Sequence, residues 1–417
     1  LTLFWNTNDV NNKESISPGF RTASNSTHTY VTGWAGRYVL TWQWNWYPSV
    51  GWQWEPVIEL RFDGYINKVD PGGAVVWTKY LSDITGDPSG GWGINDIAVE
   101  GKEIYVCGTR LGTRAFVAKL TDTDTSLICN DYTYIEGLTG IGVTYAWATA
   151  RSIAISTVDG ARQIVVGGEI QGKTMQVLEK GKTTSPAPRF TSMVLRCEYN
   201  GSEKSDGWVM TFDSGLRGTY GTTWGYHQCN DSITAVTADN TGKLYIALKS
   251  EDPDANAQAR MHHVDDTRKT VTDSNQTGID FTGGIYHDYD FWPGSTTLLF
   301  KLDTANSTQP VTHFFYPCKL ETDENGSHNH ITDIAYLGGK IYVWGDYSAW
   351  LRPVSHTIDA THKYLSTGGT SDCFLAQLNA DTLIHEKWRL WNSAGEDRAM
   401  ELTVNSSGIY VAGRTGA

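Results

Sequence analysis

Short apolar runs, each closed by a glycine or another small residue, recur along the whole chain. A run rich in β-branched and aromatic residues that ends at a turn former predicts a β-strand. The most regular version reads Ile-Tyr-Val-x-Gly, or a close variant of it. Its six copies occupy residues 28–34, 103–109, 163–168, 243–248, 340–345 and 408–413. Repetition of one phrase at this level indicates an internally repeated fold.

Three further phrases complete a repeating unit. A phrase with small residues precedes the Ile-Tyr-Val-x-Gly phrase at 95–99, 151–155, 232–236, 332–336 and 399–404. A phrase like Phe-Val-x-Lys-Leu-Asp follows it at 64–70, 115–121, 192–198, 297–303 and 373–379. An aromatic phrase ends the unit at 75–80, 208–212, 311–316 and 384–391. Helical periodicity is absent almost everywhere. Four antiparallel strands per unit, repeated about six times, predict an all-β chain folded as a single six-bladed β-propeller.

The predicted propeller spans the whole chain and is closed by the two chain ends. Its blades are expected at about 19–82, 93–136, 150–214, 231–318, 330–392, and 398–417 together with 1–9. The last unit contains only two strands, so we expect residues 1–5 to form its outer strand, which removes an exposed sheet edge. The third strand is then missing. Either this blade has three strands, or the native chain is longer, or a neighbouring subunit donates a strand.

The order of the phrases, Ile-Tyr-Val-x-Gly and then Phe-Val-x-Lys-Leu-Asp, resembles the SBBP family of β-propeller repeats, which is found in secreted proteins of bacteria and archaea. The resemblance covers about five blades, and insertions of unequal length depart from it. It implies the fold but no particular activity, because that family has no single activity.

Charge and hydropathy exclude several function classes. The 417 residues have a net charge of −13, which argues against nucleic-acid binding, because that requires a basic face. No apolar run approaches the length of a membrane span, so no membrane span is expected. The chain begins at Leu1 rather than Met, which indicates a processed or excised chain.

Cysteines and glycosylation sequons favour an extracellular or cell-surface location. The six cysteines contain no Cys-x-x-Cys pair, so they are interpreted as buried thiols or as up to three disulfides. Asn-x-Ser/Thr sequons begin at Asn25, Asn200, Asn230, Asn275, Asn306, Asn325 and Asn405. A Thr-, Asn- and Trp-rich, Lys-poor surface fits an extracellular glycoprotein, where glycans and disulfides are both permitted.

Long insertions mark one face of the predicted ring. Four connections between the second and third strands of a blade are long, at about 36–62, 170–190, 250–295 and 347–371. The turns between third and fourth strands are short and polar. Long loops in a compact domain are usually functional or disordered. Because these four connections leave the same face, we expect the function to lie there.

The first insertion is rich in tryptophan. Its candidate ligand-binding or interface residues are Trp42, Trp44, Trp46, Tyr47, Trp52 and Trp54. The first three alternate with polar residues, so they are expected on one side of an extended strand. An exposed indole platform suits stacking on sugars, with Gln43, Asn45 and Gln53 near enough to bond hydroxyls. The alternative is that the indoles pack on the propeller or on a neighbouring subunit.

Histidines in the later insertions form a weak candidate for a metal site. The candidate ligands are His262, His263, His287, His328, His330, His356 and His362. Converging imidazoles and carboxylates can bind zinc or copper, but no strict spacing such as HExxH occurs, and a solvated polar loop is the alternative. Two acidic runs, 122–126 and 323–326, resemble fragments of calcium loops but lack the Glu of an EF-hand, so turns are expected. We therefore expect no cofactor, with Ca²⁺ or a transition metal as the alternative.

Two function classes remain. The first is a non-catalytic extracellular propeller that serves as a structural or adhesive subunit in a surface or filamentous assembly of its own copies, with glycans as ligands of the Trp-rich face. The alternative is a secreted glycan-active enzyme, a glycoside hydrolase or lyase, with its site on the insertion face or in the central channel. No nucleophile elbow, P-loop or dinucleotide fingerprint occurs, and no carboxylate pair stands out. The sequence therefore favours the non-catalytic class.

Overall fold

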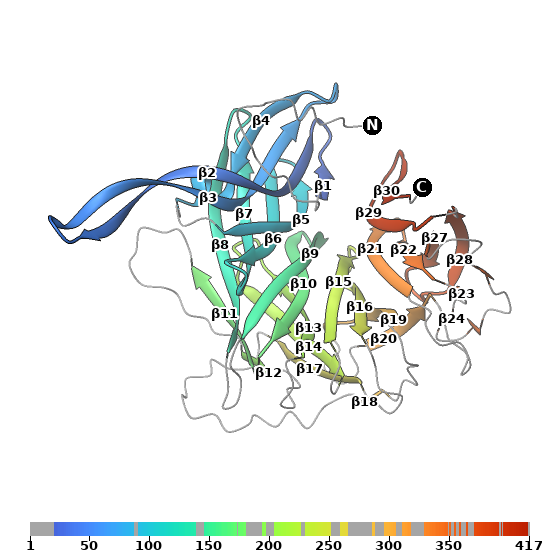
Figure 1. The fold of residues 1–417 in the computed structure, drawn as a ribbon. Helices are drawn as coiled ribbons and strands as arrows, with labels where there is room; N and C mark the ends of the chain where they lie inside the picture. The colour runs from blue at the N-terminus through green and yellow to red at the C-terminus, as the bar shows by residue number, and fades with distance from the viewer. Residues whose placement is uncertain are drawn as a thin grey trace.

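The computed structural model is a ring of small antiparallel β-sheets (Figure 1). The residues it describes are 21–86, 91–138, 146–172, 174–180, 194–196, 204–226, 230–251, 259–265, 286–287, 296–305, 311–317, 329–348, 350–351, 354–355, 358–359, 364–365, 371–391, 393 and 395–415. Within these ranges the chain is all-β apart from one short helix, α1 (Leu81–Thr85). The prediction of an all-β fold of the propeller type is confirmed.

Five sheets contain the blades, and the four strands of each blade are hydrogen-bonded in chain order. Blade 1 consists of β1 (Arg21–Ser24), β2 (Thr29–Tyr47), β3 (Gly51–Val69) and β4 (Val75–Tyr80); blade 2 of β5 (Trp92–Glu100), β6 (Glu103–Arg110), β7 (Arg114–Asp122) and β8 (Leu127–Leu138); blade 3 of β9 (Trp147–Val158), β10 (Ala161–Gln171), β13 (Asp206–Phe212) and β14 (Gly218–Tyr226); blade 4 of β15 (Asn230–Ala238), β16 (Leu244–Glu251), β19 (Thr296–Leu302) and β20 (Val311–Tyr316); blade 5 of β21 (Asn329–Leu337), β22 (Lys340–Tyr347), β27 (Asp372–Asn379) and β28 (His385–Trp391).

The prediction of six four-stranded blades was wrong, because the described chain forms five. After blade 5 it adds only β29 (Arg398–Asn405) and β30 (Gly408–Arg414), a two-stranded sheet that lies between blade 5 and β1 (Figure 1). The count was overestimated because β30 carries the same phrase as the second strands of complete blades, and the phrase does not reveal whether further strands pair with it. Residues 1–5, the expected outer strand, lie outside the described residues.

The third strand of blade 3 also differs from the prediction. Residues 192–198 match the apolar third-strand phrase, but β12 (Val194–Arg196) belongs to the insertion and lies at the outer edge of blade 2. The third strand is β13, which is buried along its whole length. A short apolar phrase fits either position, and only the pairing of distant strands distinguishes them.

A β-bulge in the inner strands explains the repeated glycine. In blade 2 the register between β5 and β6 shifts between Ile94 and Asp96, and inner strands β9, β15, β21 and β29 contain the same irregularity. A Cβ on Gly108 would overlap the carbonyl oxygen of Gly93 on the bulged strand. The glycine that ends the phrase leaves room for this carbonyl. Blade 4 departs from the rule and has Leu248 at this position.

In blades 2 and 3, the side chain just after the bulge links the inner strand to the inner strand of the next blade. The Asp96 carboxylate in blade 2 accepts a hydrogen bond from the backbone N–H of Ile153 in blade 3, at 2.8 Å. The Ser152 hydroxyl in blade 3 accepts one from the N–H of Val236 in blade 4, at 3.1 Å. These bonds satisfy buried backbone donors near the centre of the ring.

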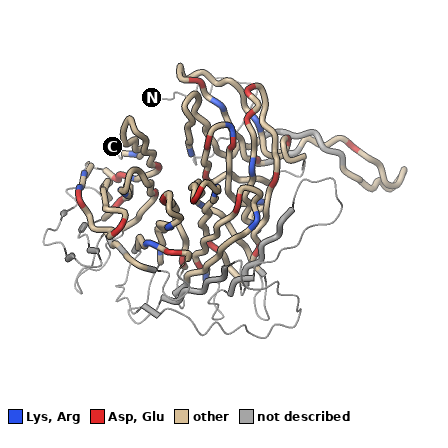
Figure 2. Tube along the Cα trace, turned by 180° about the vertical axis from the view of Figure 1, so that it is seen from behind, with Lys and Arg blue, Asp and Glu red and all other residues tan. Residues whose placement is uncertain are grey.

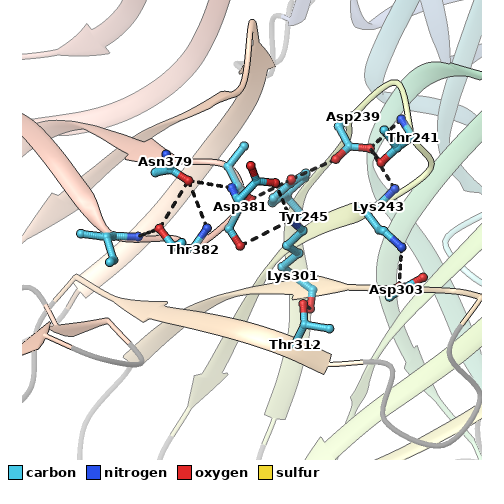
Figure 3. A network of polar contacts seen from close by, with 12 residues as sticks. Asp239, Thr241, Lys243, Tyr245, Lys301, Asp303, Thr312, Asn379, Asp381 and Thr382 are labelled. Atoms are coloured by element: carbon cyan, nitrogen blue, oxygen red, sulfur yellow. Dashed lines mark hydrogen bonds and ion pairs between the residues drawn. The ribbon is translucent and has the colours of Figure 1, made fainter.

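A tyrosine and a lysine that lie opposite each other on the second and third strands hold the next blade (Figure 3). In blade 4, Tyr245 lies opposite Lys301. The Tyr245 hydroxyl lies 2.9 Å from the carbonyl oxygen of Ala380, and the Lys301 ammonium lies 3.3 Å from the Asp381 carboxylate. Both acceptors belong to the turn between β27 and β28, so the pair joins blade 4 to blade 5.

Blade 1 uses the same arrangement. Tyr30 and Lys68 lie opposite each other, and each is 2.6 Å from the Asp122 carboxylate at the end of β7 in blade 2. In blade 5, Tyr342 lies opposite Gln377. Blade 5 thus has glutamine in place of the lysine. The sheet that follows blade 5, β29 with β30, has no third and fourth strands in the described chain and so offers no turn for a lysine to bind.

The hydrophobic core is divided among the junctions between neighbouring sheets. Val117 of blade 2 and Trp208 of blade 3 belong to one such cluster, and similar clusters join blades 1 and 2, 3 and 4, and 4 and 5. A smaller cluster joins blade 5 to β29. Cys107 and Cys373 are buried free thiols, and Cys129 is buried as well; the other three cysteines lie outside the described residues.

Three of the long insertions add strands to a neighbouring blade. β11 (Thr174–Lys180) and β12 from blade 3 extend blade 2 beyond β8; β17 (Ala259–Asp265) and β18 (Tyr286–His287) from blade 4 extend blade 3 beyond β14; β24 (Val354–Ser355) and β25 (Ile358–Asp359) from blade 5 extend blade 4 beyond β20. Two other strands of the last insertion, β23 (Trp350–Leu351) and β26 (Tyr364–Leu365), pair with each other. In all three cases the added strands pair with the blade that comes just before their own blade in the chain.

Candidate functional site

The tryptophan-rich insertion is a continuous antiparallel ribbon. β2 and β3 stay paired from Thr29 opposite Val69 to Tyr47 opposite Gly51. Only its base belongs to blade 1, because β1 and β4 pair with residues at that end alone. We call residues 36–62 the arm. It extends well beyond the ring (Figures 1 and 2).

One face of the arm is apolar and exposed. Trp44 lies opposite Trp54, with ring centroids 4.7 Å apart, and Trp46 lies opposite Trp52. Directly opposite residues share a face, and so do every second residues along a strand. The exposed side chains of this face, between 45% and 70% accessible, are Trp44, Trp46, Trp52, Trp54, Ile58, Leu60 and Phe62. The expectation that these indoles share one side holds for Trp44 and Trp46; the side chain of Trp42 is not described.

The other face of the arm tip is polar. The amide of Asn45 and the hydroxyl of Tyr47 donate hydrogen bonds to the Glu55 carboxylate, at 3.1 and 2.6 Å. The bond from Tyr47, and then that from Asn45, lowers the pKa of Glu55. Gln43 and Gln53 occupy positions of the same face. A sugar stacked on the indoles would therefore lie across the ribbon from the amides that were expected to bond its hydroxyls.

The two long edges of the arm are open within the described chain. β1 pairs with β2 only at 29–32, and β4 pairs with β3 only at 65–69. Beyond these residues, no other strand of the described chain pairs with the outer edge of β2 or β3. Such edges are templates for pairing.

Outer strands of two blades are open in the same sense. β8, β14 and β20 each have an added strand beside them, whereas β4 and β28 are the last strands of their sheets in the described chain. On β28, Lys387, Arg389 and Trp391 are exposed, Trp391 by 42%. Blade 5 therefore ends on an uncovered strand with an aromatic residue at its end.

The two-stranded sheet is exposed where complete blades are buried. In blades 2 and 4, Tyr105 and Tyr245 have no exposed surface. The corresponding Tyr410 on β30 is 53% exposed, and its neighbours Ile409 and Val411 are exposed as well. β30 pairs only with β29 in the described chain. This sheet is as apolar as the first two strands of a complete blade, but in the described chain no third strand pairs with it and the side chains of β30 are exposed.

Polar residues at the centre close the ring, and sequence reasoning missed them. The backbone N–H and hydroxyl of Thr22 in β1 donate to the Glu401 carboxylate in β29, at 2.6 and 2.8 Å. Arg21 lies 4.0 Å from Asp333. Burial raises the pKa of Asp333 to about 7, against the opposing effect of Arg21. Burial also raises the pKa of Asp96 and Glu401.

These carboxylates are occupied by the backbone. The two oxygens of Asp333 accept hydrogen bonds from the N–H groups of Ile334 and Leu402, both at 2.8 Å. Asp96 is held in the same way between two strands. Raised pKa values can mark catalytic acids, but here the geometry serves to join inner strands. The acid that follows the bulge in the phrase was visible in the sequence, whereas nothing local indicated that Arg21 would approach it.

The candidate metal ligands are dispersed or outside the described residues. His262 and His263 lie on β17 and His287 on β18, at the edge of blade 3, whereas His330 lies on β21 of blade 5. His328, His356 and His362 lie outside the described residues. No group of three or more metal-binding side chains occurs in the part of the chain that the structure describes.

The first acidic run is a turn, as expected. Asp122 lies 2.6 Å from the Lys68 ammonium, and Asp124 lies 2.8 Å from that of Lys102. Lysines thus neutralise the oxygens that a calcium loop would offer. The second run, 323–326, lies outside the described residues.

Three sequons fall on described residues. Asn405 is exposed in the turn between β29 and β30, where its side-chain oxygen accepts hydrogen bonds from Ser407 and Gly408. The Asn25 amide nitrogen donates to the carbonyl of Gly101 at 2.8 Å, so a glycan there would displace this bond. Asn230 begins β15. The others, Asn200, Asn275, Asn306 and Asn325, lie outside the described residues.

No protein-family model matches the chain, and a search of curated proteins found no similar sequence. Fold and geometry alone therefore define it as an all-β protein of the propeller type. α1, with five residues, is far too short to cross a membrane, and the described residues contain no helix that could do so.

Proposed function

We propose that this protein is a non-catalytic structural subunit of an extracellular or cell-surface assembly built from its own copies. The observation that carries the proposal is the arm, a two-stranded ribbon with an exposed apolar face and open edges. An isolated two-stranded ribbon is at best marginally stable in water. The arm would be more stable if its apolar face were buried against another surface, and the described chain provides no such surface.

The composition of the arm supports a protein surface as that partner. Residues 38–54 contain no charged residue, and Figure 2 draws the end of the arm almost entirely in the colour of uncharged residues. Contiguous apolar patches of this kind are rare on free monomers and are characteristic of interaction sites. Aromatic residues are also enriched at the buried centre of interfaces.

Location outside the cell is part of the proposal. The sequons motivate it, and exposure of Asn405 in a turn is compatible with a glycan at that position. Mass spectrometry of native material is expected to find hexose-bearing Asn405. Unmodified Asn405 together with unmodified peptides at the other sequons would contradict the extracellular part of the proposal.

Light scattering tests the assembly. The full chain is expected to show a mass well above its 46.2 kDa. Trp44→Ser/Trp46→Ser/Trp52→Ser should reduce that mass toward one chain while the β-sheet circular dichroism signal stays unchanged. A matched control, Val75→Ser/Val76→Ser on β4, changes residues of similar exposure and should leave the mass as it was. A monodisperse monomer for the unmodified chain at all concentrations would refute the proposal.

Glycan binding on the same indoles is a second candidate, favoured by the exposed rings of Trp44, Trp46, Trp52 and Trp54. Indole faces stack on the apolar faces of sugars. A glycan array compares the full chain with the same triple serine variant. Retained binding by the variant would exclude the arm as the sugar site, and turnover of a bound glycan would favour the enzyme alternative.

A further inference from the structure

Three times within this chain, an insertion adds strands to the preceding blade. β11 pairs antiparallel with β8 over seven residue pairs, from Thr174 opposite Leu138 to Lys180 opposite Tyr132. β17 pairs antiparallel with β14, and β24 with β20. β11 and β17 are each the first described strand after the second strand of their own blade. The rule is that an insertion of one blade becomes the fifth strand of the blade before it.

The rule leaves one donor, the arm, and two acceptors, β4 and β28, unmatched in the described chain. Of the two acceptors, β28 has an exposed aromatic side chain, Trp391, whereas the aromatic residues of β4 are buried or partly buried. The arm is the insertion of blade 1, and it has no acceptor in the described chain, since it projects away from the ring. β28 is the outer strand of blade 5, and no added strand lies beside it in the described chain. Figures 1 and 2 both show the arm and β28 on opposite sides of the molecule, so the arm does not reach the β28 of its own chain.

We propose that the arm of one copy adds to the outer edge of β28 in a second copy, with β2 pairing antiparallel to β28. The inference deepens the proposed function and rests on it, because it names the contact that holds the assembly. Addition of a strand to an open sheet edge is a common mode of recognition, in which backbone hydrogen bonds supply much of the affinity.

The two faces of the arm favour β28 over the other open edge of the C-terminal region, β30. A strand beside β30 would take the third position of a blade, and third strands such as β7 and β13 are buried on both faces. The arm has one apolar and one polar face, with Asn45 and Glu55 on the latter. Fifth strands lie at the outside of a blade, where one face remains in water, and this matches the arm.

The aromatic side chains at the receiving edge are a further point of agreement. The internal acceptors β8 and β14 contain Tyr134 and Trp224 in the stretch that the added strand covers. β28 carries Trp388 and Trp391 at the equivalent end of the strand, and Trp391 is exposed. Cross-strand aromatic pairs stabilise such additions.

The proposed contact can build either a closed ring or an open chain of subunits. The arm and β28 are different surfaces, so the contact is heterologous, and a heterologous contact that does not close into a ring propagates. At about 3.3 Å per residue, the twelve residues 36–47 of β2 span about 40 Å. This is long enough for the arm to reach an adjacent propeller.

Photo-cross-linking tests the contact in the full chain. We replace Trp44 with p-benzoylphenylalanine, an aromatic residue that reacts with nearby C–H bonds, and mix ¹⁵N-labelled and unlabelled copies so that links between copies are recognised. The expected product joins residue 44 of one copy to residues 385–391 of another. The matched control places the same probe at Val76 on β4, where no link to residues 385–391 is expected.

A shortened arm separates this inference from the proposed function. In this variant Asn-Gly replaces residues 38–60 and leaves the base of β2 and β3 in place. If the full chain assembles, residue 44 links to 385–391 and the shortened chain is monomeric, the contact is established. If the full chain assembles but residue 44 links to 75–80 or 408–414, or the shortened chain still assembles, the β28 contact is overturned and the assembly stands. If the full chain is monomeric, both fail.

Discussion

Buried charges at the blade junctions show how single residues set the stability of this fold. Lys68 and Asp122 are each only 2% exposed and lie 2.6 Å apart, and Tyr30 donates a further hydrogen bond to the same carboxylate oxygen. Burial alone would raise the pKa of Asp122, but the bonds from Lys68 and Tyr30 outweigh it and lower the pKa. A buried pair of this kind tolerates loss of one partner poorly, because the other charge remains without compensation.

Lys68→Met is therefore expected to destabilise the protein by about 3–5 kcal/mol, since it leaves the Asp122 carboxylate buried and uncompensated. Lys102→Met is the matched control: its partner Asp124 belongs to the same turn, but both side chains are more than 60% exposed. Exposed pairs contribute about 0–1 kcal/mol. Urea denaturation of the two variants measures the difference, and equal losses would contradict the interpretation.

At the scale of the strand, a local backbone irregularity explains the most regular feature of the sequence. The bulge of an inner strand brings a carbonyl oxygen against the second strand, and the phrase ends in glycine where this occurs. The arm shows the opposite case, in which two strands pair without irregularity over nineteen opposite positions and form a ribbon. Five inner strands therefore carry bulges, whereas the arm offers a long edge without a bulge that another sheet can use.

Gly108→Ala tests the bulge explanation. The added methyl group would overlap the Gly93 carbonyl oxygen, and overpacking of this type costs about 1–3 kcal/mol. Gly93→Ala, on the neighbouring strand, is the matched control, because its Cβ would meet only an ordinary contact of 3.6 Å with the Thr109 carbonyl. Thermal melts of both variants are expected to show the larger loss for Gly108→Ala, and a similar loss in both would argue against the bulge.

At the scale of the whole molecule, the ring is closed by polar contacts rather than by a blade of full size. Asp333 joins β21 to β29, Glu401 joins β29 to β1, and Arg21 lies beside both. Hydrophobic clusters occupy the four junctions between complete blades, and a smaller cluster accompanies Asp333 where blade 5 meets β29. Closure should therefore respond to pH, whereas the blades themselves are held by apolar packing.

Asp333→Asn is expected to change how stability depends on pH. Burial raises the pKa of Asp333 to about 7 in the native state, so the native state binds a proton more tightly than the unfolded state. The stabilisation from this group is complete below the unfolded pKa, about 3.9, and is lost as the pH rises through about 7. Each pKa unit corresponds to about 1.4 kcal/mol, so the loss is at most about 4 kcal/mol. Asn removes this titration and retains an oxygen acceptor.

The free energy of unfolding of both proteins is measured from pH 4 to pH 8. The stability of Asp333→Asn should rise relative to that of the unmodified chain up to about pH 7, and the difference should stay constant above that pH. Titrating groups that do not interact with Asp333 act equally on both chains, so the difference between the two profiles reports Asp333 together with the carboxylates coupled to it, Asp96 and Glu401. Parallel profiles would show that Asp333 does not take up a proton on folding.

The sequence by itself determined the strand character, the four-phrase unit, the positions of the long insertions and the exposed tryptophan segment. These follow from local physics, because alternation, β-branched residues and turn formers act over a few residues, and the glycine of the phrase reflects a bulge within its own blade. The tertiary structure alone decided that five complete blades form, that 194–196 extends blade 2, that the amides lie across the arm from the indoles, and that Arg21 approaches Asp333. Each of these depends on strand pairing or packing between residues far apart in the chain. A short apolar phrase has the same local preference in an inner, a third or an added strand, and only its neighbours in space determine which it becomes.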